Sequence, residues 1–204
     1  MSWRRLAISA FGAVGGLRIV ERWFGRDRLT VLAYQRVVDH AASGFLGFVQ
    51  NASASPESFA EQMRLVAAEY NPISISEVAD AVDGRLLPDR ALLVTFDDGY
   101  RDNYDSALPA LTEYSIPAVV FLATDHIGSD DPFWWDRVAW MFDTTGPGEK
   151  VLPVLGQASW ESTGEVAERW IAAVKSLAES ERKSRSTSWL RCLSHPRLLW
   201  TSDG

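Results

Sequence analysis

Residues 92–100 read Leu-Leu-Val-Thr-Phe-Asp-Asp-Gly-Tyr, an apolar and β-branched run that ends abruptly in two carboxylates and a glycine. An uninterrupted apolar run suits a strand buried on both faces, as in a parallel sheet covered by helices. Side chains alternate along a regular strand, so Asp97 and Asp98 reach one cavity only if the chain bends. Gly99 permits a bend because it tolerates backbone angles that other residues avoid. The run therefore predicts an α/β fold with two acids at the carboxyl end of a strand, where such folds bind ligands.

Taken alone, an Asp-Asp-Gly sequence is also common in solvent-exposed turns. The acidic stretch 97–105 suggests a calcium loop as well, but its residue types do not match the spacing of an EF-hand. The alternative with more chemical content is a hydrolytic site, in which one carboxylate binds a metal ion and the other accepts a proton from water.

The surrounding sequence favours the hydrolytic site. The hexapeptide Thr-Phe-Asp-Asp-Gly-Tyr at 95–100 resembles the first signature motif of the NodB-homology polysaccharide deacetylases, also called carbohydrate esterase family four. The resemblance covers residues 30–142 and includes segments 31–38, 55–63, 101–111, 116–122 and 133–136. It implies an α/β fold of the deacetylase type, a partial and distorted (β/α) barrel.

The resemblance also implies chemical roles for the two acids. Asp97 corresponds to the general base, and Asp98 to a ligand of a divalent metal ion, usually zinc. The implied reaction is hydrolysis of an acetyl group on a carbohydrate, with release of acetate. A metal-bound water has a pKa of about 7, and a nearby carboxylate accepts its proton as the water attacks.

Four further residues are predicted to contact the acetylated carbohydrate. Tyr100 lies within the motif, and Gln35 stands where relatives usually have histidine, so its amide orients substrate without moving protons. Trp134 and Trp135 are expected on a loop, where an aromatic face can cover the apolar face of a sugar ring. The alternative is that one of the two tryptophans packs in the core and the other caps it.

The metal site implied by the resemblance is incomplete in this sequence. Catalytic zinc generally has three protein ligands, and the family's other two are histidines of a second motif. The chain has three histidines, His40, His126 and His195, and none is near another. His195 precedes a proline as in that motif, but Arg191 stands four residues earlier, and a guanidinium cannot act as a ligand. The second motif is therefore expected to be absent, with His195 as a divergent ligand and His126 in the cleft as alternatives.

Three functional hypotheses follow. The first is a polysaccharide deacetylase-like hydrolase that removes N-acetyl or O-acetyl groups and carries the first half of the site. The second is a non-catalytic carbohydrate-binding or interaction module. The third is an inactive fragment in which an incomplete barrel leaves strand edges unpaired and apolar surface exposed.

Composition narrows the partners and the organisation. The formal net charge of −7 argues against nucleic acid as a partner, because phosphate binding needs a basic surface. The single cysteine, Cys192, excludes an internal disulfide. We expect a deacetylase-type domain over 30–204, with a loop and helical insertion at about 144–195.

The first 29 residues are expected to form a separate apolar or amphipathic segment. Its apolar stretch is too short to span a bilayer, and it lacks a clear cleavage site for a secretory signal. Packing on the domain and weak contact with a membrane surface are both compatible with it. A cytoplasmic or membrane-associated location is favoured, and export stays open.

Local signals predict several elements. Ser55 and Pro56 open a helix, and Ser74 with Glu77 forms a capping box for a short helix that ends at Gly84. Pro109 should start or kink a helix within 102–114. Further predictions are a buried strand from residue 117, a loop over 144–163 and a helix over 164–193.

Overall fold

The computed structural model describes residues 28–181, apart from 43, 46, 146, 153 and 179. Contacts divide the chain into two compact units. Unit 1 comprises the residues up to Val38 together with Ala54–Ala123, and unit 2 comprises Asp39–Ser53 and the residues from Thr124 onward. Within the described range, no helix has the length and apolar character needed to cross a membrane. Almost all of the predicted segment 1–29 lies outside the described residues, and so does Cys192.

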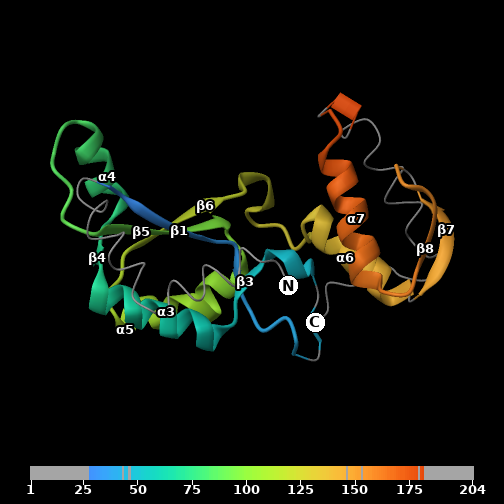
Figure 1. Cartoon of the computed structure of the whole chain (residues 1–204), viewed down its shortest axis with the longest axis horizontal. Helices are drawn as coiled ribbons and strands as arrows, with labels where there is room; N and C mark the ends of the chain where they lie inside the picture. Colours follow the sequence, from blue (N-terminus) through green and yellow to red (C-terminus); the bar gives the residue numbers. More distant parts are fainter. Residues whose placement is uncertain are drawn as a thin grey trace, which may run out of the picture. The chain divides into compact units, whose positions relative to one another are not determined.

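A parallel sheet forms the centre of unit 1 (Figure 1). Its strands are β1 (Thr30–Tyr34), β4 (Asn71–Pro72), β5 (Ala91–Asp98) and β6 (Ala118–Leu122), and the short β2 (Arg36–Val37) and β3 (Ala52–Ala54) lie outside it. β5 is central and pairs with each of the other three strands, with Tyr34 opposite Phe96 and Leu122 opposite Asp98. Every residue from Ala91 to Phe96 is buried, which confirms the prediction from the apolar run.

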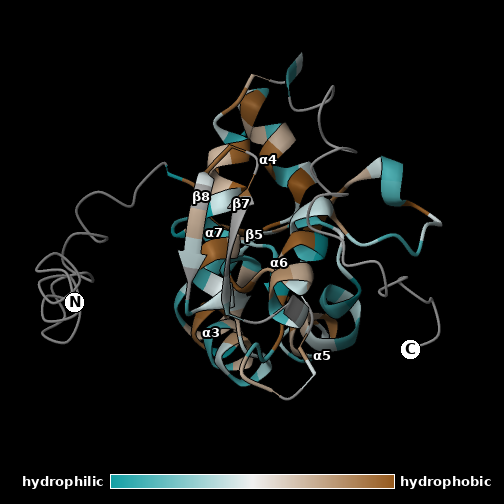
Figure 2. Ribbon diagram, turned by 90° about the vertical axis from the view of Figure 1, so that its right-hand side faces the viewer, coloured by the Kyte–Doolittle hydropathy of each residue, from teal (hydrophilic) through white to brown (hydrophobic). Residues whose placement is uncertain are grey.

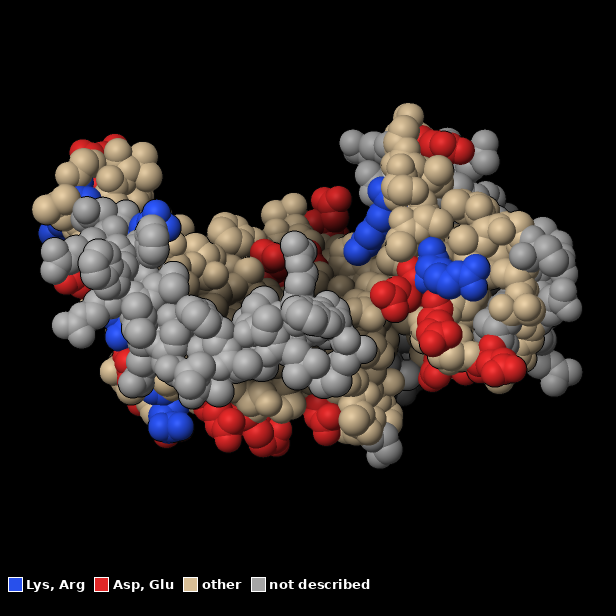
Figure 3. All heavy atoms as spheres, in the orientation of Figure 1, with Lys and Arg blue, Asp and Glu red and all other residues tan. Residues whose placement is uncertain are grey.

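The helices α3 (Pro56–Glu69) and α5 (Leu108–Glu113) lie against the same face of this sheet (Figure 1). In α3, Phe59, Met63 and Val66 are buried, whereas Glu57 and Glu61 are exposed. Acidic side chains accordingly line the lower edge of the molecule in Figure 3, where α3 lies. The helix begins as predicted, because the Ser55 side chain accepts a hydrogen bond from the N–H of Ser58.

The helix α4 (Ile75–Val82) has the predicted capping box and ends just before Gly84, whose φ is +100°. The next helical segment is irregular. Residues Asn103–Ala107 form a π-helical turn directly before α5, and the Leu108 N–H donates to the carbonyl of Asn103. Pro109 explains this turn: it has no N–H to donate, and its ring collides with the carbonyl four residues earlier. The predicted interruption at Pro109 is confirmed.

The prediction that residues from Pro117 form a buried strand is wrong in one respect. The strand β6 forms, but four of its five residues are exposed, including Phe121 at 53% and Leu122 at 56%. The apolar sequence Ala-Val-Val-Phe-Leu resembles that of an interior strand. Among the described residues, however, β6 pairs only with β5, so it lies at an edge of the sheet.

The main elements of unit 2 among the described residues are two helices and a β-hairpin. These are α6 (Trp134–Thr145), α7 (Thr163–Lys175), β7 (Gly148–Leu152) and β8 (Gly156–Trp160), with the short 3₁₀ turns Val49–Asn51 and Thr124–His126. Figure 2 shows hydrophobic (brown) turns on both α6 and α7. The core includes Val138 and Phe142 of α6 and one face of α7, where Val166, Trp170 and Val174 are buried.

Two predictions for this region need correction. The antiparallel hairpin β7–β8 replaces the predicted loop over 144–163. The helix predicted over 164–193 ends at Lys175, and residues 182–193 lie outside the described range. Hairpin formation has a packing reason, since Leu152 and Ala158 are both buried in the core of unit 2.

The α/β class predicted from the sequence is confirmed by the parallel sheet and its covering helices. The strands do not close into a barrel within the described range, in agreement with the expected partial barrel. The predicted division into 1–29 and 30–204 stays a prediction.

Alkaline pH should weaken unit 1 through Tyr34. Its ring is 7% exposed, and its hydroxyl donates to Gln62 Oε1 at 2.5 Å. Burial raises the pKa of Tyr34 from 10.0 to about 12. The unfolded chain therefore loses this proton first, so the free energy of unfolding falls between pH 10 and pH 12, by up to about 2 kcal/mol. Urea unfolding at pH 9 and pH 11 should show a smaller fall for Tyr34→Phe than for the wild type; equal falls would contradict this.

Candidate active site

The two predicted acids lie where β5 leaves the interior. Phe96 is 1% exposed, whereas Asp97 is exposed and Asp98 is half-buried. β5 runs parallel to both β1 and β6, so the acids lie at the carboxyl edge of the sheet. In open α/β sheets this edge is where ligands bind. The apolar run of the strand thus delivers two carboxylates to an accessible edge.

The backbone changes from extended geometry to positive φ angles at Asp98 and Gly99. Asp98 has a φ of 69° and Gly99 a φ of 76°, and the Gly99 N–H donates to the Asp97 carbonyl at 2.9 Å. This bond and the positive φ define a γ-turn centred on Asp98, a strained form that costs about 1–3 kcal/mol. The sequence predicted the bend at Gly99, whereas it begins one residue earlier. Strand alternation therefore stops at Asp98.

Gly99 suits this position because of its backbone conformation. Its φ lies in the region that side chains disfavour. A Cβ atom built there would overlap only the terminal Cδ2 methyl of Leu122 on the neighbouring β6, and this side chain is exposed enough to move aside. The positive φ is therefore the main reason for glycine at residue 99.

The structure brings Gln35 and Asp98 together, as two of the predicted site residues. The Gln35 side chain donates from Nε2 to Asp98 Oδ2, across 63 residues of sequence. Gln35 follows β1, and β1 is the parallel neighbour of β5. The amide therefore fixes one oxygen of the Asp98 carboxylate.

An ion pair that the sequence did not predict, Arg36 with Asp102, lies next to Tyr100 through its arginine. The Arg36 Nε and Asp102 Oδ2 atoms are 2.8 Å apart, with side chains only 14% and 13% exposed. Asp102 Oδ1 also accepts the N–H of Val37 at 3.0 Å. The Arg36 guanidinium lies over the Tyr100 ring, 4.7 Å from its centroid. Arg36 follows β1 and Asp102 follows β5, and these two strands are parallel neighbours. Their positions just after the two strands were the signal in the sequence that the two side chains could meet.

Asp102→Ala should destabilise unit 1 by about 2–4 kcal/mol, because it removes the carboxylate that pairs with the shielded Arg36 charge and the acceptor for the Val37 N–H. Urea denaturation followed by circular dichroism measures this loss. The matched control is Asp105→Ala, whose partner Arg101 is 84% exposed, and there the change should stay below about 1 kcal/mol. Equal losses in the two variants would show that the Arg36–Asp102 pair has no special role.

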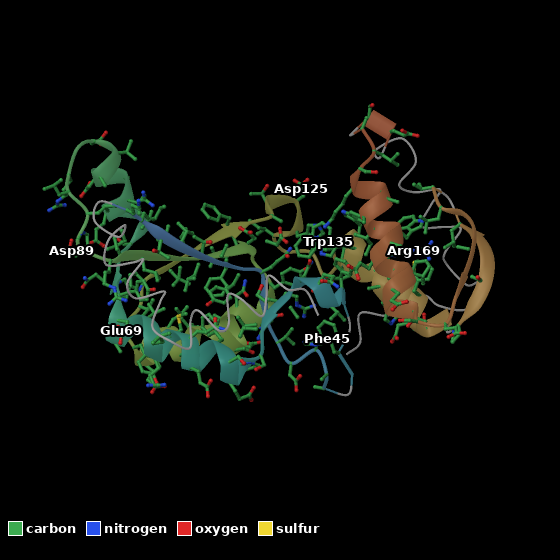
Figure 4. All side chains as sticks on the ribbon, in the orientation of Figure 1. Phe45, Glu69, Asp89, Asp125, Trp135 and Arg169 are labelled. Carbon is green, nitrogen blue, oxygen red and sulfur yellow. The ribbon has the colours of Figure 1, made fainter. Side chains whose placement is uncertain are left out.

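The predicted substrate residues Trp134 and Trp135 belong to unit 2. They lie at the first turn of α6 and not on a loop, and both are half-buried. Figure 4 labels Trp135. Trp135 stacks on Phe133 with ring centroids 5.0 Å apart and planes 3° apart. Lys175 Nζ lies 5.5 Å from the Trp135 ring centroid. One face of Trp135 is thus already covered, and a role in sugar binding stays a prediction for both residues.

Asp136, in the segment 133–136 of the resemblance, is buried. It is 7% exposed and accepts the N–H of Phe48 at 2.7 Å. This contact joins α6 to the segment 39–53 within unit 2. Asp136 is therefore a structural residue.

Zinc ligands are incomplete among the described residues. No group of three or more His, Cys, Asp and Glu side chains in this range could hold a metal ion. His126 lies in unit 2, with Nδ1 3.2 Å from the carbonyl oxygen of Asp131, and His40 lies in an exposed turn. His195 lies outside the described range. The described residues do not make a complete zinc site, and we derive no step through a metal ion.

Comparison with known proteins supports the resemblance of the motif at residues 95–100 to the deacetylases. Residues 85–145 match the family model described as polysaccharide deacetylase. This segment of the chain is therefore similar to the polysaccharide deacetylases, the family whose motif the sequence resembles. Its matched range includes β5, both acids and all of β6. Polysaccharide deacetylases generally use a divalent metal ion.

Two curated relatives are poly-β-1,6-N-acetyl-D-glucosamine N-deacetylases. The protein from Staphylococcus epidermidis is 34% identical over 82 residues, which are 40% of this chain and 28% of that protein. The protein from Escherichia coli K12 is 28% identical over 155 residues, 73% of this chain and 20% of that protein. The chain therefore spans less than a third of the length of either relative.

A solved de-N-acetylase from Aggregatibacter actinomycetemcomitans superposes with a TM-score of 0.46 at 22% identity, covering 77% of this chain and 75% of that chain. The similarity to the deacetylases rests on the sequence matches and not on this superposition.

Proposed function

We propose that this chain is a carbohydrate deacetylase that hydrolyses the N-acetyl group of an amino sugar to acetate and a free amine. One observation carries the proposal: β5 delivers Asp97 and Asp98 to the carboxyl edge of a parallel sheet inside the segment that matches the deacetylases. Two hydrolases that act on poly-N-acetylglucosamine are among its relatives, which supports an N-acetylated polymer as the substrate class.

Asp97 is proposed as the general base. It is exposed, so a water molecule and a substrate can both approach it. Its carboxylate accepts a proton as the water oxygen forms a bond to the acetyl carbon, and the C–N bond then breaks with proton transfer to the amine. Asp97 is the only carboxylate on β5 apart from Asp98.

Asp98 is proposed as a ligand of the divalent metal ion, zinc by resemblance to the family. Its Oδ2 atom is already fixed by Gln35, so the carboxylate is held in one orientation. Oriented ligands of this kind are what metal sites use, because outer contacts fix the ligand geometry. Gln35 thereby acquires a positioning role that complements the predicted contact with substrate.

The test is acetate release from β-1,6-linked N-acetylglucosamine oligomers by the full chain, with Zn²⁺ or Co²⁺ added. We expect acetate release that depends on the metal ion, and metal binding that Asp98→Asn weakens at least tenfold by calorimetric titration. Asp83→Asn, an exposed acid at the end of α4, should change neither property. Absence of both acetate release and metal binding in the wild-type chain would rule out catalysis by this chain.

A further inference from the structure

A cavity that is separate from the two acids lies on the side of the sheet that α5 covers. Its volume is about 940 Å³, and it lies between β6 and the segment that runs from Gly99 through α5. Side chains from both sides line it: Tyr104, Leu108 and Leu111 from the helical segment, and Val120 and Leu122 from β6. Both elements can be followed in Figure 1. Asp97 and Asp98 do not line it.

The lining of this cavity is open and apolar. Leu108 and Val120 are each 42% exposed, and Tyr104 is 68% exposed. Exposed apolar side chains that converge on one hollow are a common mark of a binding site, in contrast to single apolar residues scattered over a surface. The cavity volume lies within the range of about 300–1,000 Å³ that is typical of small-molecule sites.

Asn103 gives this mainly apolar cavity a buried polar group, in addition to the polar residues Ser74, Glu77, Thr112 and Ser115 of its lining. It lines the cavity and is only 8% exposed, and neither its Oδ1 nor its Nδ2 atom has a hydrogen-bond partner. Its backbone is satisfied, since the N–H donates to the Tyr100 carbonyl at 3.0 Å and the carbonyl accepts the Leu108 N–H. Within Asn103, only the side-chain amide therefore lacks a hydrogen-bond partner.

A buried amide without a partner is unusual, because native proteins satisfy almost all buried polar atoms. Asn103 also belongs to the π-helical turn that Pro109 produces, and such turns occur frequently at functional sites. An amide offers one acceptor and two donors. The matching ligand group is one that both donates and accepts, such as a primary amide or a hydroxyl.

We propose that this cavity binds a small, mainly apolar molecule that carries one primary amide or hydroxyl group. The apolar body contacts Leu108, Val120 and Leu122, and the polar group exchanges hydrogen bonds with the Asn103 amide. The site does not depend on deacetylase activity, so its test and that of the proposed function fail separately.

Two probes of similar size test the proposal, benzamide and toluene, added to the full chain in an NMR titration of backbone amides. We expect both probes to shift resonances of residues that line the cavity, with benzamide the tighter. Asn103→Leu should weaken benzamide about tenfold, the effect of one well-made pair of hydrogen bonds, and leave toluene binding unchanged or tighter. Val120→Ser, on an exposed strand position, should weaken both probes.

Three results would overturn the proposal: no binding of either probe, as expected if the cavity holds water only; resonance shifts confined to other regions; or equal benzamide affinity in Asn103→Leu and the wild type. Asn103→Leu should also raise Tm, because it removes an unsatisfied amide. If that variant does not fold, Val120→Ser decides alone, and unchanged binding of both probes would reject the site.

Discussion

The Asp97→Asn variant is expected to release acetate about 10²- to 10⁴-fold more slowly than the wild-type chain, the usual contribution of a general base. Asparagine has nearly the same shape as aspartate but accepts no proton at neutral pH. Asp97 is exposed, and its backbone carbonyl, which accepts the Gly99 N–H, is unchanged by the substitution. The loss should therefore appear in kcat and leave folding intact, as measured by steady-state acetate release and thermal unfolding.

The two acids should be separable by metal binding. Asp97→Asn should keep the affinity for Zn²⁺ or Co²⁺ while turnover falls, whereas Asp98→Asn should lose affinity. Retained turnover in Asp97→Asn would exclude it as the base. A parallel loss of metal affinity in both variants would instead show that the two carboxylates bind the metal ion together.

The largest effect on folding is expected from Phe59→Ala, which should lower the free energy of unfolding by about 3–5 kcal/mol. Phe59 is fully buried, and its ring meets those of Tyr34 and Phe96 with centroids 4.9 Å and 5.8 Å away. Domains of this size have total stabilities of about 5–15 kcal/mol, so the variant should be marginal at 37 °C. Urea denaturation measures the change.

Leu65→Ala on the same helix is the matched control, since Leu65 is 52% exposed. Its cost should be below about 1 kcal/mol, because little apolar surface leaves water at that position. A loss below 1 kcal/mol for Phe59→Ala would mean that the aromatic cluster of Tyr34, Phe59 and Phe96 does not hold α3 on the sheet.

Elements with local signals were predictable from the sequence. Ser55 and Ser74 mark helix starts because their side chains bond backbone N–H groups within the next turn, and this contact needs no distant residue. β5 was predictable for a related reason, since six buried positions in a row leave little choice of environment. The position of Asp97 and Asp98 at a sheet edge follows directly from where that run ends.

Elements whose surroundings decide their state were not predictable. The apolar composition of β6 indicates a preference for burial, but the sequence does not say whether any element covers it. The hairpin β7–β8 was predicted as a loop because its composition favours turns, and its formation depends on packing of Leu152 and Ala158 in unit 2. In both cases tertiary contacts outweigh local propensity.

The candidate site shows the same division. Motif resemblance predicted Asp97 and Asp98 as site residues, and Gln35 by its position at the end of the first strand. Asp102 and Asp136 were missed as structural residues because an acid near a helix start is usually solvated. Only the fold shows that each accepts a backbone N–H from a distant segment, Val37 for Asp102 and Phe48 for Asp136.

The left-handed backbone at Asp98 limits what mutagenesis of this position can reveal. Aspartate, asparagine and glycine adopt a positive φ at a lower cost than alanine, for which the penalty is about 1 kcal/mol. An alanine replacement therefore perturbs the bend and deletes the carboxylate in a single step, so its phenotype has two causes. Asparagine removes the charge and one acceptor oxygen but keeps the shape of the side chain. Glycine removes the side chain without opposing the bend, and the two variants together separate the two effects that an alanine variant combines.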